Sequence, residues 1–193
     1  IKKPISYKED KDVKAFTIFE QYQFIAYAQA HPSKYNNILL LSLFTGMRIG
    51  EVLALRLQDI DIDLEYITIN QTMTRDKHDK TTIGTTTKTK SGKRKIKVLQ
   101  QAKPILEKAI KEMTSNRDNL IFIRSNNKYY EDGQVNSAFK RICMNAGIRV
   151  IDTKHKKYSK TKGYYYVNQR TSDVNTHMLR HSFATRAIEA GVT

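Results

Sequence analysis

The chain has 193 residues, of which 34 are Lys or Arg and 19 are Asp or Glu, so its formal net charge is +15. This length supports one domain with a sizeable core. So strong an excess of positive charge points to a polyanionic partner, most simply nucleic acid, although a basic protein without such a partner also fits. The single cysteine excludes an internal disulfide framework, and no apolar run reaches the roughly 18 residues that a membrane-spanning helix needs.

The first quarter of the chain is predicted to be helical. Residues 1–13 are polar and lysine-rich and read as a lead-in. Apolar residues recur at helical spacing over residues 18–30, and Pro32 ends this helix because the residue before a proline is pushed out of the α region. Residues 35–44 are nearly all apolar, which predicts a deeply buried helix, and residues 48–56 predict another helix.

The hydrophobic period then changes from helical to alternating. Residues 66–70 alternate and are β-branched, which predicts a strand. The threonine-rich residues 81–89 and the residues 95–99 predict two more strands, with a lysine-rich turn at residues 88–94 between them. These lengths fit a three-stranded antiparallel sheet. The basic turn by itself reads equally as a solvated hairpin tip.

The second half returns to helices. Residues 101–113 predict an amphipathic helix, and residues 120–123 predict a short buried segment rather than a full strand. Residues 133–146 predict a helix that ends at Gly147 and carries Cys143, which we expect to be buried and inert. The fold class is therefore α+β and mostly helical.

Residues 149–174 are rich in basic and tyrosine side chains and are predicted to form a hairpin. The segment holds Lys154, Lys156, Lys157, Lys160, Lys162 and Arg170, interleaved with Tyr158, Tyr164, Tyr165 and Tyr166. Such a mixture can follow a DNA backbone and pack on its sugars, and a solvated loop explains the composition equally well.

Residues 177–185, with the sequence HMLRHSFAT, read as the start of a helix capped by Asn175 or Thr176. His177, Arg180 and His181 are three and four residues apart, so they share one helix face. A guanidinium binds phosphate bidentately and an imidazole donates to it or moves protons, which predicts a phosphate site. A surface helix with a few polar residues, or a His177/His181 zinc pair without a third ligand, are the alternatives.

Residues 45–55, with the sequence TGMRIGEVLAL, follow the predicted buried helix. Gly46 is placed as the glycine that ends that helix, Arg48 lies at the mouth of the next one, and Glu51 follows one turn later. Taken alone, this segment could be an arginine paired with a glutamate inside a helical domain.

Together the two segments resemble the signature boxes of the tyrosine recombinases, the phage-type integrase family. The family pattern is T-G-x-R-x-x-E-hydrophobic in the first box and H-x-L-R-H-[ST]-x-A-[ST] in the second. Both match here in the same order, with Arg48 and Arg180 about 130 residues apart. The resemblance implies a DNA breaking-rejoining fold over residues 1–193: a mostly helical catalytic domain with a small three-stranded antiparallel sheet.

The resemblance also implies roles for single residues. Arg48 and Arg180 would stabilise charge on the non-bridging phosphate oxygens, and His177 would handle a proton or bind a phosphoryl oxygen. In the family a hairpin lysine protonates the leaving 5′-oxygen. The pattern (T/P)-K-T-x-S-x-x-R-x-(I/V) matches residues 87–96 and selects Lys88, with Lys90 as the alternative.

Supporting roles follow for further residues. Glu51 would orient an active-site cation or imidazole, and His181 is expected to be a packing residue rather than a catalyst. Lys93, Arg94 and Lys95 are expected to contact DNA beside the catalytic lysine.

The reaction implied is cutting and rejoining of DNA by transesterification through a 3′-phosphotyrosine, as in an integrase of a phage or mobile element. No cofactor and no metal are expected, because cationic side chains would stabilise the charge. The expected partners are double-stranded DNA attachment sites, a tetramer on DNA for the full-length protein, and accessory DNA-bending or excision factors. The expected location is the cytoplasm of a bacterial or phage-infected cell. A type IB topoisomerase-like enzyme and a non-catalytic DNA-binding module are the alternatives.

The sequence departs from the family pattern in three ways. The third box and the nucleophilic tyrosine would lie beyond Arg180, yet all eleven tyrosines precede the second box. The family's core-binding and arm-binding domains are expected to lie outside these residues, and residues 149–174 look like an insertion. We therefore expect a C-terminally truncated catalytic domain that does not cleave DNA by itself.

Overall fold

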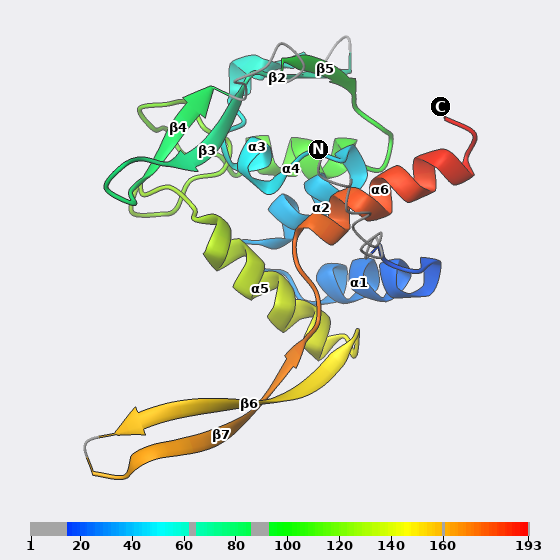
Figure 1. Ribbon diagram of the computed structural model, residues 1–193. Coiled ribbons are helices and arrows are strands. Elements are labelled where there is room, and N and C mark those ends of the chain that lie inside the picture. Colours follow the sequence, from blue (N-terminus) through cyan, green and yellow to red (C-terminus); the bar gives the residue numbers. More distant parts are fainter. Residues whose placement is uncertain (1–14, 62–64, 86–92, 160, 193) are drawn as a thin grey trace, which may run out of the picture.

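The computed structural model describes residues 15–61, 65–85, 93–159 and 161–192 (Figure 1). In chain order the helices are α1 (Ile18–Ala30), α2 (Asn36–Thr45), α3 (Ile49–Leu53), the short 3-10 helix η1 (Leu57–Asp59), α4 (Lys103–Lys111), α5 (Asp132–Asn145) and α6 (His177–Glu189). The strands are β1 (Ile60–Asp61), β2 (Tyr66–Ile69), β3 (Gln71–Arg75), β4 (Thr81–Thr85), β5 (Arg94–Lys97), β6 (Val150–Ser159) and β7 (Gly163–Ser172). The α+β class predicted from the sequence is confirmed.

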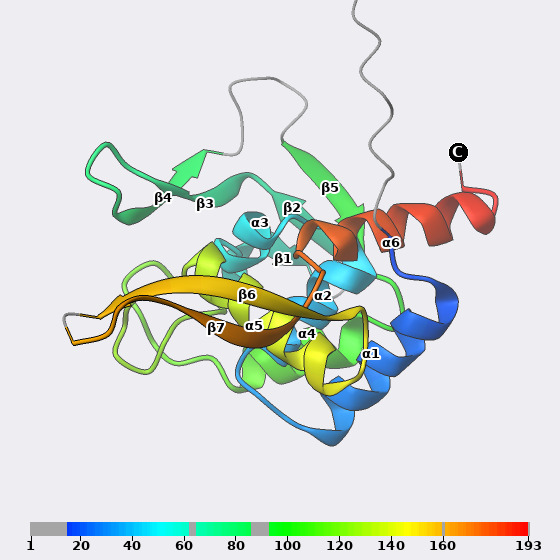
Figure 2. The ribbon, with the colours of Figure 1, turned by 60° about the horizontal axis from the view of Figure 1, so that its bottom comes forward.

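Helix α2 is the centre of the core. Every residue from Ile38 to Leu43 is buried, and α1, α3, α4 and α6 all pack against this helix (Figure 2). Beside it, the rings of Phe16, Phe24 and Phe139 lie with centroids 5.4–5.9 Å apart, which joins α1 to α5. Burial on all sides therefore explains why this stretch of the sequence is nearly all apolar.

Helix α3 is shorter than the sequence predicts, because it ends at Leu53 rather than at residue 56. The following residues pair with the segment at 119–121: the Ile121 amide donates to the Leu55 carbonyl at 2.9 Å, and the Leu57 amide donates to the Asn119 carbonyl at 3.1 Å. These bonds take the backbone out of the helix. Leu120, Ile121 and Phe122 are buried and Ile123 is partly buried, which confirms a short buried segment rather than a full strand.

The membership of the small sheet differs from the prediction. Strand β2 pairs directly with β5, with Ile67 opposite Ile96, and β1 completes the three-stranded antiparallel sheet. Of the strand predicted at residues 81–89, residues 86–89 lie outside the described residues. The described part is β4, which instead pairs with β3, a strand that was not predicted. The cause is a turn at Asp76, whose carboxylate accepts hydrogen bonds from the His78 and Lys80 amides and closes a local hairpin.

The segment at 149–174 forms a long two-stranded hairpin, β6–β7, which confirms the predicted hairpin. Figure 1 shows it extending away from the helical body below α5, and the chain returns from β7 directly into α6. Cys143 is buried on α5 as expected, and burial raises the pKa of its thiol. No helix within the described residues has the length and apolarity to cross a membrane.

The C-terminal end of α2 meets α6 at Gly46. Its φ of +66° places it in the left-handed region at the C-cap of α2, which confirms the predicted turn glycine. A Cβ built at this position would collide with the ring of Phe183 on α6. The first signature box can therefore approach the second only because residue 46 has no side chain.

Gly46→Ala is expected to lower the free energy of unfolding by about 2–4 kcal/mol, since it adds a clash with Phe183 to the cost of a left-handed alanine. Gly147→Ala is the matched control, because Gly147 has a φ of +75° and nothing lies within 4 Å of its Cβ position. The control should lose only about 1–2 kcal/mol in equilibrium urea unfolding. Equal losses would show that the Phe183 ring moves aside freely.

Candidate active site

The turn between α2 and α3 is held by two side chains at the end of α2, Ser42 and Thr45. The Ser42 hydroxyl donates to the Met47 carbonyl at 2.8 Å, and the Thr45 hydroxyl donates to the Leu41 carbonyl at 2.5 Å. The Met47 amide in turn donates to the Thr45 hydroxyl at 3.3 Å. This turn fixes the backbone immediately before Arg48, which is the N-cap residue of α3.

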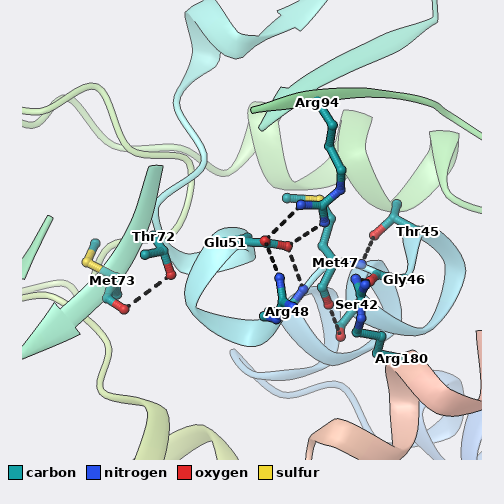
Figure 3. Close-up of polar contacts among 10 residues, drawn as sticks. All are labelled: Ser42, Thr45, Gly46, Met47, Arg48, Glu51, Thr72, Met73, Arg94 and Arg180. Atoms are coloured by element: carbon teal, nitrogen blue, oxygen red, sulfur yellow. Dashed lines mark hydrogen bonds and ion pairs between the residues drawn. The ribbon is translucent and has the colours of Figure 1, made fainter. Parts of the chain in front are cut away.

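Glu51 is the hub of the site (Figure 3). Its carboxylate is only 3% exposed and accepts the Arg48 backbone amide at 2.9 Å and Arg48 Nη1 at 3.2 Å. Arg94, at the start of β5, reaches the same carboxylate with both terminal nitrogens, at 2.9 Å and 2.7 Å. A bidentate guanidinium–carboxylate pair fixes the relative orientation of the two groups. Glu51 therefore ties β5 to the N-terminus of α3.

The electrostatics of Glu51 follow from this packing. Burial raises its pKa, but the hydrogen bonds from the Arg94 side chain and the Arg48 backbone, together with the charges of both arginines, outweigh burial. The net pKa lies below the ordinary value of 4.5, so the carboxylate is ionised at neutral pH.

Arg180 approaches this group from α6. It is half-buried, and its Nη1 donates to the carbonyl of Gly46, in the first box (Figure 3). Burial lowers the pKa of Arg180, and the positive charges of Arg48 and Arg94 lower it further. Two guanidinium groups thus bind the Glu51 carboxylate and a third lies close enough to feel their charges, so positive charge exceeds negative charge in this cluster. An anion bound here would relieve their mutual repulsion.

Arg48 and His177 meet in a cleft of about 340 Å³. The Arg48 side chain is 56% exposed, in contrast to the 27% of Arg94, so Arg48 keeps a surface for a ligand while bonded to Glu51. His177 is the first residue of α6 and is exposed. Its amide donates to the Asn175 side chain at 3.0 Å, so Asn175 rather than Thr176 supplies the capping oxygen.

The remaining predicted residues are placed as follows. The ring of His181 is half-buried, 6.4 Å from the ring of His177. Lys93 and Lys95 are exposed on either side of Arg94. Lys88 and Lys90 lie outside the described residues. Arg94, which the sequence analysis grouped with the DNA-contacting residues, has its guanidinium on Glu51.

The structure adds cleft residues that the sequence analysis did not single out. The cleft is lined by Arg48, Ile49, Gly50, Thr72, Met73, Thr74, Arg75, Thr81, Asp132, Thr176 and His177. Many of them belong to β3, which packs closely on α3: a Cβ on Gly50 would lie 2.6 Å from the Thr72 hydroxyl oxygen. Arg75 is held by Asp79 at 2.6 Å. The sequence of β3 does not alternate clearly between apolar and polar residues, so no local pattern indicated that this strand lines a site.

The chemistry of this cleft is that of an anion site. Arg48 of the first box and the exposed imidazole of His177 line the cleft, and Arg180 of the second box is bonded to the turn just before Arg48. Guanidinium groups suit phosphate oxygens in geometry as well as charge. Within the described part of the chain, no three His, Cys, Asp or Glu side chains gather as metal ligands. The arrangement can therefore bind a phosphodiester and stabilise negative charge that develops on it.

Comparison with known proteins gives one family. The sequence model of the phage integrase family matches residues 14–193. The transposases of transposon Tn916 from Enterococcus faecalis and of transposon Tn1545 from Streptococcus pneumoniae are each 28% identical over 190 residues, which cover 90% of this chain and 40% of each relative. The chain thus spans less than half the length of these relatives.

Solved structures show the same fold. The integrase of transposon Tn1549, in complex with a circular intermediate DNA, superposes with a TM-score of 0.74 at 19% identity, covering 97% of this chain and 57% of that one. The XerA recombinase superposes with a TM-score of 0.63 at 16% identity, covering 98% of this chain and 53% of that one.

Arg94→Ala is expected to lower the free energy of unfolding by about 2–4 kcal/mol, because it leaves the buried Glu51 carboxylate with Arg48 as its remaining side-chain cation. Lys95→Ala is the matched control. Lys95 lies next to Arg94 and its side chain is exposed. The control variant should therefore lose no more than about 0.5 kcal/mol of unfolding free energy in the same urea titration. A similar loss for both variants would exclude a specific contribution of the Arg94–Glu51 pair.

The effect of Arg94→Ala should also depend on pH. In the wild-type chain the pKa of Glu51 is lowered, so its contribution to stability is complete above about pH 4.5 and is lost as the pH falls through the folded-state pKa. Without Arg94, the effect of burial on the Glu51 pKa is less opposed, so protonating Glu51 costs less stability than in the wild-type chain. The stability difference between the two proteins should therefore be largest at neutral pH and shrink below about pH 4.5. A difference independent of pH would contradict this account.

Proposed function

Because the chain belongs to the phage integrase family, we propose that it is the catalytic domain of a site-specific DNA recombinase of a mobile element. The observation that carries this proposal is the cleft in which Arg48 of the first box and His177 of the second meet, with Arg180 hydrogen-bonded to the turn beside them. The guanidinium groups of Arg48 in the cleft and of Arg180 beside it suit a DNA phosphodiester in charge and geometry.

The proposed reaction is a transesterification. A tyrosine hydroxyl oxygen attacks the scissile phosphorus, the bond to the 5′-oxygen breaks, and a 3′-phosphotyrosine and a free 5′-hydroxyl result. A 5′-hydroxyl of a second DNA strand then attacks the phosphorus, the bond to the tyrosine oxygen breaks, and a phosphodiester and the free tyrosine hydroxyl result. One ester replaces another in each step, so the reaction balances without a nucleotide cofactor.

Arg48 and Arg180 would stabilise the charge that develops on the non-bridging oxygens. Removing one such preorganised donor typically slows a reaction by about 10²–10³-fold. His177 would accept the tyrosine proton or bind a phosphoryl oxygen, and Lys88 would protonate the leaving 5′-oxygen. Glu51 and Arg94 do not face the phosphate in this scheme. They would hold the Arg48 backbone and side chain in place.

None of the eleven tyrosines in these 193 residues follows Arg180. In the order of the family pattern, the nucleophile follows the second box. We therefore propose that these residues alone bind DNA without forming a covalent adduct, and that the protein at its natural full length forms one.

The names of the relatives support a mobile element. The Tn916 and Tn1545 proteins are transposases, and the Tn1549 integrase was solved with circular intermediate DNA. By this likeness the substrate of the present protein would be duplex attachment sites at the ends of an element. Assembly as a tetramer on two duplexes, with accessory DNA-bending or excision factors, in a bacterial or phage-infected cytoplasm, would follow from the same proposal.

The test uses the full-length protein and a suicide DNA substrate with a nick beside the crossover. A covalent protein–DNA adduct should appear on a denaturing gel without divalent metal. Arg48→Ala and Arg180→Ala should each reduce its rate of formation by about 10²–10³-fold. Lys88→Ala should reduce it more than Lys90→Ala, and the reverse order would assign the acid to Lys90.

Two outcomes would overturn the proposal. Tight DNA binding without an adduct on any candidate attachment site would leave a non-catalytic DNA-binding module. An adduct that relaxes supercoiled DNA but never exchanges strands between two sites would instead identify a type IB topoisomerase-like enzyme. Unchanged adduct formation in both arginine variants would show that the cleft is not the reaction site.

A further inference from the structure

The β6–β7 hairpin has no role in the chemistry proposed above. Its strands contribute ten residues each and pair in regular antiparallel register from Val150 opposite Ser172 to Ser159 opposite Gly163. It is also strongly basic: residues 150–172 contain six Lys or Arg against one acidic residue, Asp152. A projection this long and this basic presents a large positively charged surface outside the cleft.

The register sorts the side chains, because residues directly opposite each other in an antiparallel pair point to the same face. One face carries the opposed pairs Asp152–Arg170, Lys154–Asn168, Lys156–Tyr166 and Tyr158–Tyr164; we call it the lysine–tyrosine face. The other face carries Thr153–Gln169, His155–Val167 and Lys157–Tyr165. Three of the hairpin's four tyrosines thus share a face with Lys154, Lys156 and Arg170.

The tyrosines of this face are open to solvent. Tyr158, Tyr164 and Tyr166 are 65%, 70% and 68% exposed, whereas Tyr165 on the other face is partly covered. The rings of Tyr158 and Tyr164 lie with centroids 5.1 Å apart, and Lys156 Nζ lies 4.3 Å from the Tyr164 ring centroid. The aromatic and cationic groups form one continuous, preorganised surface.

We infer that the lysine–tyrosine face binds the sugar–phosphate backbone of duplex DNA outside the cleaved phosphodiester. Lysines neutralise phosphates, tyrosine hydroxyls donate to phosphate oxygens, and the ring faces pack on sugars. This inference rests on the proposed function, because it takes the same duplex as the partner. It adds a second contact surface that is separate from the arginine cleft.

The placement of the hairpin suits this role. Four residues, 173–176, connect the end of β7 to His177, so the hairpin starts beside the cleft. Ten strand residues extend about 33 Å, close to one turn of a DNA duplex. Figures 1 and 2 show β6–β7 and the β3–β4 hairpin projecting toward the same side of the molecule, at the left of both views.

A second copy of the chain is the main alternative occupant, and the composition of the face argues against it. Lysine is depleted in protein–protein interfaces, which are built around a desolvated apolar centre. The tyrosines here are instead set among cations, and two copies with a formal charge of +15 each would repel one another. Duplex DNA matches the charge of this face.

The adjacent residues Lys156 and Lys157 provide the test. Both are exposed, and they differ in which face of the hairpin they occupy. The affinity of the full-length protein for a fluorescent duplex is measured by anisotropy over a range of salt concentrations. For Lys154→Ala/Lys156→Ala the slope of log K against log salt should become shallower by about 2, since each lost phosphate contact removes about 0.9.

Lys157→Ala should leave the slope unchanged. Tyr166→Ser should weaken binding with the slope unchanged, because it removes a neutral contact. The loss should be the same on unrelated sequences, since backbone contacts carry no sequence information. Far-ultraviolet circular dichroism and a thermal melt of each variant show whether the hairpin and the fold are retained. Lys156→Gln replaces the alanine variant if they are not.

A slope change for Lys157→Ala as large, per lysine removed, as that of the Lys154→Ala/Lys156→Ala double variant would overturn the inference, because the effect would then be diffuse electrostatics. Unchanged slopes with reduced self-association in sedimentation would assign the face to a second copy. Adduct formation by the wild-type protein is scored separately on the suicide substrate. If the wild-type protein forms the adduct but the hairpin variants bind DNA like the wild type, only this inference is wrong. If the slope changes are specific to one face but no adduct forms, only the proposed recombinase function is wrong.

Discussion

The architecture of the site depends on one buried carboxylate that two arginines share. Glu51 is desolvated, and an isolated charge in that position would cost several kcal/mol. Arg94 and Arg48 offset this cost with hydrogen bonds from both sides, at 2.7–3.2 Å. In doing so they fix the start of α3 against the start of β5. The exposed part of Arg48 is thus presented to the cleft by an ion-pair network rather than by packing of its own side chain.

A second constraint brings the other half of the site into place. The left-handed turn at Gly46 lets the ring of Phe183 pack against the end of α2, and the same turn offers its carbonyl to Arg180. Apolar packing and a polar contact therefore act at one residue. Because α2 is buried on all sides, a shift of α6 would disturb the core as well as the cleft, so the relative placement of the two boxes is rigid.

Charge is distributed unevenly over the molecule, and the distribution suits a large anionic partner. The arginine cluster is compact, partly buried and tied to Glu51, which favours recognition of one phosphate group in a defined orientation. The β6–β7 hairpin is extended and exposed, and its lysines and tyrosines suit many equivalent contacts along a polymer. The first kind of surface can serve chemistry and the second can serve positioning on a duplex.

Local sequence patterns were enough to predict the helices, the turn at Gly46, the hairpin at 149–174 and the two boxes, because periodicity, capping and turn chemistry act within a few residues. The roles assigned to Arg48, His177 and Arg180 also came from the sequence and stay predictions. The contact of Arg94 with Glu51, 43 residues away, and the pairing of β2 with β5 rather than with residues 81–85 became visible in the folded chain alone. The folded chain also sets which hairpin face gathers the tyrosines, since a register shift of one residue would exchange the faces. These long-range pairings depend on the relative free energies of alternative contacts between distant segments, and a local sequence pattern carries no information about those differences.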